Sequence, residues 1–257
     1  MLIGLLVMRA TCGKPRPTGE MQIKAIEKIK ITDKVYYHNM SITFDGDNYF
    51  TINGGNTDYS VINKYDTKGK FITSYDLSLD GRTIFYNPDD YEMYIKIYGT
   101  DLTMINLDDE TYDTELSEVF TNEQSSVGFL SENNTIYELG EDGIVKTFDL
   151  TTGDEINNYN LDQYSTEDRF NCSIATSDQY IFVWGSTDNE VLIYDLEGTY
   201  INKVILPRAG YSFSLSYCNG MLWIAVDADA KEMLGNGYWY GYKLEGLDSD
   251  INNIFAF

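Results

Sequence analysis

The sequence is poor in positive charge and in histidine. Its 257 residues include 18 Lys and Arg against 41 Asp and Glu, which gives a formal net charge of −23, and there is one histidine. The acidic residues are spread through the turns, and such a surface repels a phosphate backbone and an anionic membrane face. We therefore expect no nucleic-acid binding, and the charge itself favours a well-solvated surface.

Cysteine is also rare, with three residues in the chain. Cys172 and Cys218 are too few for a disulfide framework, and they lie about one repeat apart, so that two buried free thiols and a single bridge are both compatible with the sequence. The sequence has no Cys/His metal-ligand spacing, no phosphate-binding glycine loop and no G-x-S-x-G elbow. These absences remove the commonest signatures of metal, nucleotide and hydrolase chemistry.

Long apolar runs are missing as well. The N-terminal segment, residues 1–20, reads MLIGLLVMRATCGKPRPTGE, and its apolar run is too short to span a bilayer. We expect an export leader here, followed by one domain over residues 21–257. Cys12 after Ala10 and Thr11 resembles the lipid-bearing cysteine of bacterial lipoproteins, although Arg9 stands where that signal usually has Leu. Three alternatives follow for the location of the protein. They are a lipid anchor at Cys12, which would be the only membrane contact, other secretion into the envelope or medium, and a cytoplasmic location.

What the chain has in quantity is Tyr and Phe, 22 and 12 residues, together with a repeated phrase. The phrase reads YDTKGKFITSYDL at 65–77, FDLTTGDEINNYNL at 148–161 and YDLEGTYINKVILP at 194–207. A degenerate copy at 104–120 and a truncated one at 242–247 complete a series spaced by about 40 to 48 residues. This is the period of a four-stranded propeller blade.

Each repeat contains two further predicted strands ahead of the phrase, joined by a tight turn rich in Gly, Asn and Asp. The phrase itself is then the third strand, a turn and the fourth strand of one antiparallel blade. After each of the tight turns an aromatic residue falls at nearly the same place: Phe50, Tyr94, Tyr137, Phe182 and Trp223. The pattern predicts blades over 41–79, 80–121, 122–162, 163–207 and 208–247.

The YD-x-x-G turn followed by an alternating strand resembles the β-propeller repeat families, in particular the NHL-repeat and related lactonase-like or quinoprotein-like propellers, over residues 41–247. The Gly-His and Trp-Asp pairs of WD repeats do not occur. The resemblance implies an all-β propeller, which we predict to have five four-stranded antiparallel blades, with six as the alternative. It implies a fold and not an activity.

The last predicted blade lacks its outer strand. A propeller ring closes best when one blade is built from both ends of the chain, because the exposed sheet edge then disappears. Residues 22–31, QIKAIEKIKI, alternate as such a strand should, and 251–257 is the competing segment. We expect the N-terminal segment to close the ring.

Candidate site residues cluster in the loops that lead into the innermost strands. Arg82, Arg169 and Arg208 each lie ahead of a predicted innermost strand, so that three cations are expected near one channel mouth, where they would recognise a carboxylate or phosphate. The alternative is that each pairs with a nearby acid and stiffens its loop. Tyr37, Tyr211 and Ser212 are predicted neighbours of this mouth.

His38 is the one candidate for a general base, and some propeller lyases resemble this architecture and use histidine in that way. One histidine without a second is more typical of a residue lining the mouth. Acidic clusters near Asp45, Asp108 and Asp227 suggest calcium as an alternative to the expected absence of a cofactor, but none matches a D-x-D-x-D-G loop. The aromatics at 184, 223 and 238–240 suit either sugar stacking or core packing.

These observations predict a monomeric, non-enzymatic binding module that engages a protein, a glycan or a small anionic molecule at the rim or channel mouth. The alternative is a propeller lyase or hydrolase acting at the central channel through His38 and acidic partners.

Overall fold

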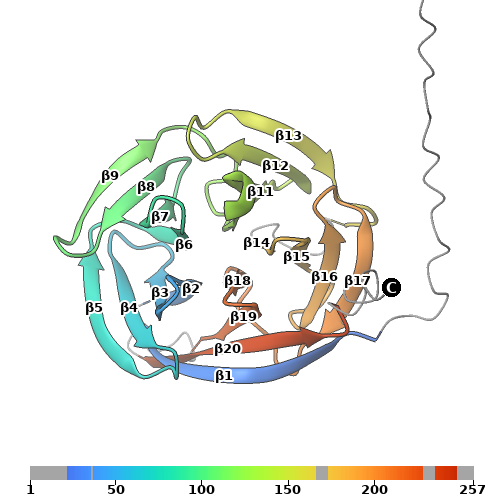
Figure 1. Ribbon diagram of the computed structural model, residues 1–257, viewed down its shortest axis with the longest axis horizontal. Helices are drawn as coiled ribbons and strands as arrows, with labels where there is room; N and C mark the ends of the chain where they lie inside the picture. The colour runs from blue at the N-terminus through green and yellow to red at the C-terminus, as the bar shows by residue number, and fades with distance from the viewer. Residues whose placement is uncertain (1–21, 36, 166–172, 228–234, 248–257) are drawn as a thin grey trace, which may run out of the picture.

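The computed structural model describes residues 22–35, 37–165, 173–227 and 235–247. They form five four-stranded antiparallel sheets arranged in a ring around a central axis, and the prediction of a five-bladed propeller is confirmed (Figure 1). No helix in these residues is long and apolar enough to cross a membrane.

In blades 1 to 4 the strands follow one another outward from the axis in chain order, and in blade 5 the first strand of the chain is outermost. Blade 1 comprises β2 (His38–Phe44), β3 (Asn48–Gly54), β4 (Ser60–Asp66) and β5 (Phe71–Leu77). Blade 2 comprises β6 (Gly81–Asn87), β7 (Glu92–Ile97), β8 (Leu102–Asn106) and β9 (Thr111–Leu116). Blade 3 comprises β10 (Val127–Leu130), β11 (Thr135–Leu139), β12 (Ile144–Asp149) and β13 (Glu155–Asn160), with the 3-10 turn η1 (Ser131–Asn133) between β10 and β11. Blade 4 comprises β14 (Ile174–Thr176), β15 (Tyr180–Trp184), β16 (Glu190–Asp195) and β17 (Tyr200–Ile205). Blade 5 comprises β18 (Ser216–Cys218), β19 (Met221–Val226), β20 (Gly235–Glu245) and β1 (Lys24–Val35).

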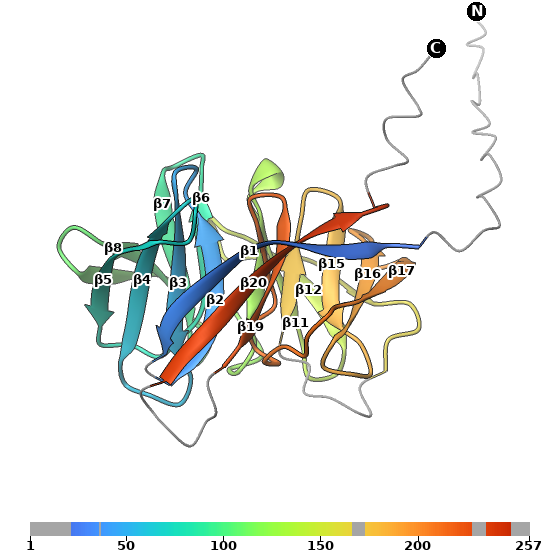
Figure 2. The same ribbon diagram turned by 90° about the horizontal axis from the view of Figure 1, so that it is seen from below.

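The two ends of the described chain meet in blade 5. Strand β1 pairs with β20 from Lys24 opposite Glu245 to Val35 opposite Gly235, with one irregularity between Glu27 and Ile29 (Figure 2). The N-terminal segment therefore closes the ring, as expected, and the strand extends four residues beyond the predicted 22–31. The competing segment 251–257 lies outside the described residues.

The repeated phrase is the outer hairpin of blades 1 to 4, as predicted. In the first copy, Oδ1 of Asp66 accepts hydrogen bonds from the backbone N–H groups of Lys68 and Lys70, both at 2.9 Å. Asp149, Asp195 and Asn106 accept equivalent turn bonds in the other copies. Gly69 adopts φ +78°, a left-handed conformation without a Cβ penalty. The repeated Asp and Gly are thus turn-forming residues.

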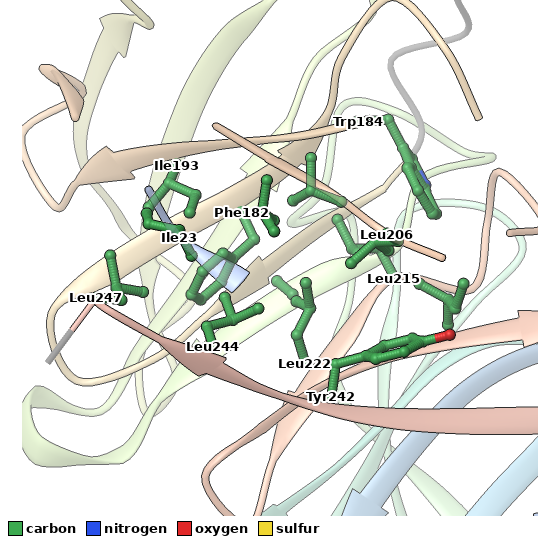
Figure 3. Packing of buried hydrophobic residues seen from close by; sticks show 14 of the residues in the cluster. Ile23, Phe182, Trp184, Ile193, Leu206, Leu215, Leu222, Tyr242, Leu244 and Leu247 are labelled. Atoms are coloured by element: carbon green, nitrogen blue, oxygen red, sulfur yellow. The ribbon is translucent and has the colours of Figure 1, made fainter. Parts of the chain in front are cut away.

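Aromatic residues of the second strands fill the spaces between blades. The five predicted from sequence occupy one equivalent position of β3, β7, β11, β15 and β19, and each belongs to a different inter-blade apolar cluster: Phe50, Tyr94, Tyr137, Phe182 and Trp223. Figure 3 shows the cluster between blades 4 and 5, to which Phe182, Trp184 and Tyr242 all belong. Trp223 and Trp239 are fully buried, so the tryptophans serve core packing.

Side-chain hydroxyls join the innermost strands to one another. In every blade a buried Ser or Thr accepts a hydrogen bond from a backbone N–H of the next blade. The bonds are Tyr86 N–H to Thr43 (3.2 Å), Val127 N–H to Thr83 (2.9 Å), Ile174 N–H to Ser126 (3.2 Å), Leu215 N–H to Ser173 (3.2 Å) and Ile42 N–H to Ser216 (3.3 Å). We call the five accepting residues, Thr43, Thr83, Ser126, Ser173 and Ser216, the hydroxyl ring. It satisfies donors that no β-ladder can reach at the centre of a propeller.

Candidate functional site

The central channel opens into a cavity of about 360 Å³ at the end where the first and second strands of each blade turn. All five blades line it, through residues 41–46, 83–86 with Pro88, 127–129 with Ser131, 175–176 and 216–219. We call this cavity the channel bowl. Its volume lies in the range of small-molecule sites, and a concave site shared by all blades is the first place to look for a ligand.

The inner part of the bowl carries hydroxyl groups that already have partners. Ser41 Oγ lies 3.3 Å from Ser216 Oγ and 3.4 Å from the carbonyl oxygen of Ile84. Thr83 and Ser216 belong to the hydroxyl ring and accept backbone N–H groups of the neighbouring blades. These groups make a polar surface whose hydrogen-bonding capacity is largely used within the protein.

The wall of the bowl is aromatic. The five innermost strands share one register position, which is occupied by Phe44, Tyr86, Phe129, Thr176 and Tyr217 in blades 1 to 5. Across the first hairpin of each blade these residues pair with Tyr49, Met93, Ile136, Ile181 and Leu222, in the same order. All five residues at the shared position line the bowl. Four of the blades thus contribute an aromatic residue that is partly buried between blades, and blade 4 contributes the smaller threonine. We call Phe44, Tyr86, Phe129 and Tyr217 the aromatic wall.

Neighbouring rings hold two members of the aromatic wall in place. Phe129 stacks on Phe85 with the ring centroids 4.5 Å apart, and Tyr217 stacks on Phe182 at 5.3 Å. Aromatic pairs at these separations are favourable beyond the area that they bury. The wall is therefore preorganised, which lowers the entropic cost of binding.

The mouth of the bowl is acidic. Asp45 is the one charged residue among those that line the bowl in the described part of the chain, and its Oδ1 accepts the N–H groups of Asp47 and Asn48 at 2.8 and 2.6 Å. Desolvation, and after it the charges of Asp45, Tyr91, Asp90 and Asp47, raise the pKa of Tyr86. The mouth therefore has a negative potential.

The predicted site residues lie mainly at the opposite end of the channel, where β2 begins. His38 Nδ1 is 2.8 Å from Asp227 Oδ2, and the other oxygen of Asp227 accepts the Asn39 N–H at 3.0 Å. The His38 ring stacks on Tyr211 with centroids 4.6 Å apart, and Tyr37 directly precedes it. Histidine and tyrosine are thus brought together, and the carboxylate partner comes from a residue 189 positions away.

Arg82 lies near His38 but is buried. It is the second residue of β6, inside the strand and not in the loop ahead of it, and it is 2% exposed. Its Nη2 donates to Asp80 at 2.9 Å. A Cβ at Gly55 would meet His38 Cδ2 at 3.4 Å and Arg82 Nη1 at 3.8 Å, so both side chains flank Gly55.

Arg208 is placed against blade 5 and does not meet Arg82. Its Nη1 donates to Glu27 at 2.6 Å and to the Tyr242 hydroxyl at 3.2 Å, and the guanidinium lies 4.1 Å from the centre of the Tyr240 ring. Both described arginines of the prediction therefore pair with an acid. Arg169 lies outside the described residues.

Two buried residues of opposite charge, Lys96 and Glu138, were not predicted from the sequence. Lys96 on β7 is fully buried, and its Nζ donates to the carbonyl oxygens of Asn122 and Glu123 at 2.9 and 2.7 Å. Glu138 on β11 accepts the N–H groups of Thr121 and Asn122 at 3.0 and 2.8 Å. Together they clamp the connection between blades 2 and 3. Burial lowers the pKa of Lys96 to about 7, although the charge of Glu138 opposes the shift.

Metal and thiol chemistry find no site in the described ranges. No three His, Cys, Asp or Glu side chains there are grouped so that they could hold a metal ion. Cys218 is a free thiol at the bowl, and burial raises its pKa, which makes it unreactive. Cys12 and Cys172 lie outside the described residues, so the lipid anchor at Cys12 remains a prediction, whereas the free thiol of Cys218 argues against the alternative of a bridge to Cys172.

Comparison with known proteins identifies the fold. No protein-family model matches the sequence, and a search of curated proteins finds no match. The crystal structure of Myxococcus xanthus glutaminyl cyclase is similar to this chain with a TM-score of 0.59 at 9% identity, over 88% of this chain and 99% of that one. BamB from Moraxella catarrhalis gives a TM-score of 0.40 at 20% identity, over 79% of this chain and 59% of that one. The first likeness agrees with the ring described above, and the chain is a five-bladed β-propeller.

Proposed function

We propose that this protein is a binding module that takes a small organic molecule into the channel bowl. The observation that carries the proposal is the bowl itself, a cavity of about 360 Å³ built from the equivalent position of all five innermost strands. A preorganised aromatic wall over a polar floor is the usual construction of a ligand site. We further propose, from the N-terminal segment, that the chain is exported.

The bowl suits a neutral or positively charged ligand better than an anion. The anionic ligand predicted from the arginines has less support, because Arg82 pairs with Asp80 and Arg208 with Glu27. The mouth carries Asp45 instead of a cation. The proposed site is therefore at the opposite end of the channel from the one that the arginines suggested.

A thermal-shift screen of sugars, amines and organic acids tests the proposal when it is run on the wild type and on a variant with a blocked bowl. Ser131→Trp places an indole at the bowl, and Ser74→Trp on the exposed face of β5 is the matched control. We expect at least one class of compound to stabilise the wild type and the Ser74→Trp control but not Ser131→Trp. Binding that is indifferent to Ser131→Trp would exclude the bowl as the site.

The second candidate is a lyase or hydrolase that uses His38. Its support is the contact between His38 and Asp227, because a carboxylate on Nδ1 orients the ring and leaves Nε2 for proton transfer. The His38 side chain is 30% exposed, which gives solvent or a substrate access to it. A panel of esters and lactones tests this candidate: turnover by the wild type that is lost in His38→Gln would establish it, and no turnover would leave the binding module.

A further inference from the structure

The aromatic wall brings partly buried aromatic residues of four blades to one cavity, where they could surround a positive charge. Phe44, Tyr86, Phe129 and Tyr217 come from four different blades and line one cavity. The face of an aromatic ring carries negative potential and attracts a cation within about 6 Å of its centre, and sets of such rings bind quaternary ammonium groups. Thr176 at the fifth position leaves room for the rest of a ligand on the side of blade 4.

The charges around the bowl point the same way. Asp45 stands at the mouth, and Asp47 and Asp90 lie close enough to act on the Tyr86 hydroxyl. No lysine or arginine lines the bowl in the described part of the chain. The whole chain carries a net charge of −23, which favours the approach of cations over that of anions.

A sugar is a poorer fit to the same cavity. Sugars need many hydrogen bonds as well as an aromatic face, and the hydroxyls of Ser41, Thr83 and Ser216 are already bonded to neighbouring blades. A carboxylate or phosphate would meet the charge of Asp45 with no cation to offset it. The remaining ligand chemistry is a cation whose charge is spread over methyl or alkyl groups.

On these grounds we propose that the channel bowl binds an organic cation of the substituted ammonium type, with its charged group against the aromatic wall and near Asp45. This inference rests on the proposed function, since it names the ligand class of the same bowl. The cation is attracted by the ring faces and the carboxylate, while its alkyl surface is removed from water by Phe44, Phe129 and the two tyrosines.

The decisive comparison is between choline and 3,3-dimethylbutan-1-ol, which have the same shape and differ in the positive charge. Isothermal titration calorimetry on the full chain should give choline at least tenfold higher affinity than the neutral alcohol. Asp45→Asn keeps the turn-forming oxygen and removes the charge, so it should weaken choline binding several-fold. Asp142→Asn, an exposed turn aspartate of the loop between β11 and β12, is the matched control and should not change it.

The outcomes separate the two proposals. If both compounds bind equally and Ser131→Trp abolishes both, the bowl is a ligand site but the ligand is not a cation, and this inference is overturned. It is overturned in the same way if only sugars or organic acids bind with a dependence on Ser131. If choline binds Ser131→Trp as well as the wild type, or if no compound of any class depends on that position, the proposed function falls together with the inference.

Discussion

Replacement of Asp33 by alanine should show how strongly the ring is closed between blades 5 and 1. Asp33 on β1 is fully buried, and its carboxylate accepts four hydrogen bonds. The donors are Asn63 Nδ2 at 2.7 Å, the Tyr65 hydroxyl at 2.5 Å, Asn53 Nδ2 at 3.3 Å and Trp239 Nε1 at 3.1 Å. Three belong to blade 1 and one to β20, so one side chain ties the closing blade to its neighbour.

The magnitude follows from the donors that the substitution strands. A buried donor left without a partner costs about 1 to 3 kcal/mol, and some of the four will find water or each other once the carboxylate is gone. We therefore expect Asp33→Ala to lower the free energy of unfolding by about 3 to 5 kcal/mol, against a total of about 5 to 15 kcal/mol for a typical domain.

The pH dependence has a definite sign. Burial raises the pKa of Asp33 above its ordinary value of 3.8, although its hydrogen bonds oppose the shift. The folded state therefore holds this proton more tightly than the unfolded state, and the group's contribution to stability is complete below pH 3.8 and is lost as the pH rises through the raised pKa. The difference in the free energy of unfolding between the wild type and Asp33→Ala should thus decrease as the pH rises from 3.8 through the raised pKa of Asp33.

Urea unfolding followed by tryptophan fluorescence measures the effect, because Trp239 contacts Asp33 directly. Thr32→Ala, at the exposed neighbouring position of β1, is the control and should stay within about 0.5 kcal/mol of the wild type. A loss of less than about 1 kcal/mol in Asp33→Ala would contradict this expectation, since four buried donors would then have lost their acceptor at almost no cost.

Three further substitutions test other parts of the fold by the same unfolding assay. Glu110 adopts φ +53° at the turn position held by glycine in other copies, so Glu110→Gly should raise the free energy of unfolding by about 0.5 to 1 kcal/mol, whereas Glu110→Ala should not. Ser173→Ala removes a member of the hydroxyl ring and should cost about 1 to 3 kcal/mol, with exposed Ser74→Ala as the neutral control. Burial lowers the pKa of Lys96 from 10.5 to about 7, so the folded state releases this proton at a lower pH than the unfolded state does. The free energy of unfolding of the wild type should therefore rise between pH 7 and 10.5 relative to that of Lys96→Met. A difference in stability between the two proteins that is constant with pH would contradict this.

Features written in local sequence were predictable. The repeated Asp and Gly specify a turn through bonds within four residues, as Asp66 shows, and alternation with a fixed period then places the strands. The aromatic at one position of every second strand was visible for the same reason. The N-terminal closing strand followed from the missing outer strand of the last blade and from the cost of an exposed sheet edge.

The site was harder to predict because its contacts join distant residues. His38 meets Asp227 and Arg208 meets Glu27 across 189 and 181 positions, and no local pattern announces such pairs. The aromatic wall was a different case. Phe44, Tyr86, Phe129 and Tyr217 share a register position next to the first turn of each blade, so aligning the repeats by their first hairpins is enough to reveal four aromatics and a threonine.

Binding of an organic cation in the channel bowl can be observed in a crystal of the protein soaked with (2-bromoethyl)trimethylammonium, whose bromine gives an anomalous signal. We predict a bromine peak in the channel bowl with the trimethylammonium group against Tyr86 and Tyr217, and its loss in Ser131→Trp. A peak confined to other surfaces, or an empty bowl at ligand concentrations that saturate any stabilisation in solution, would contradict the account.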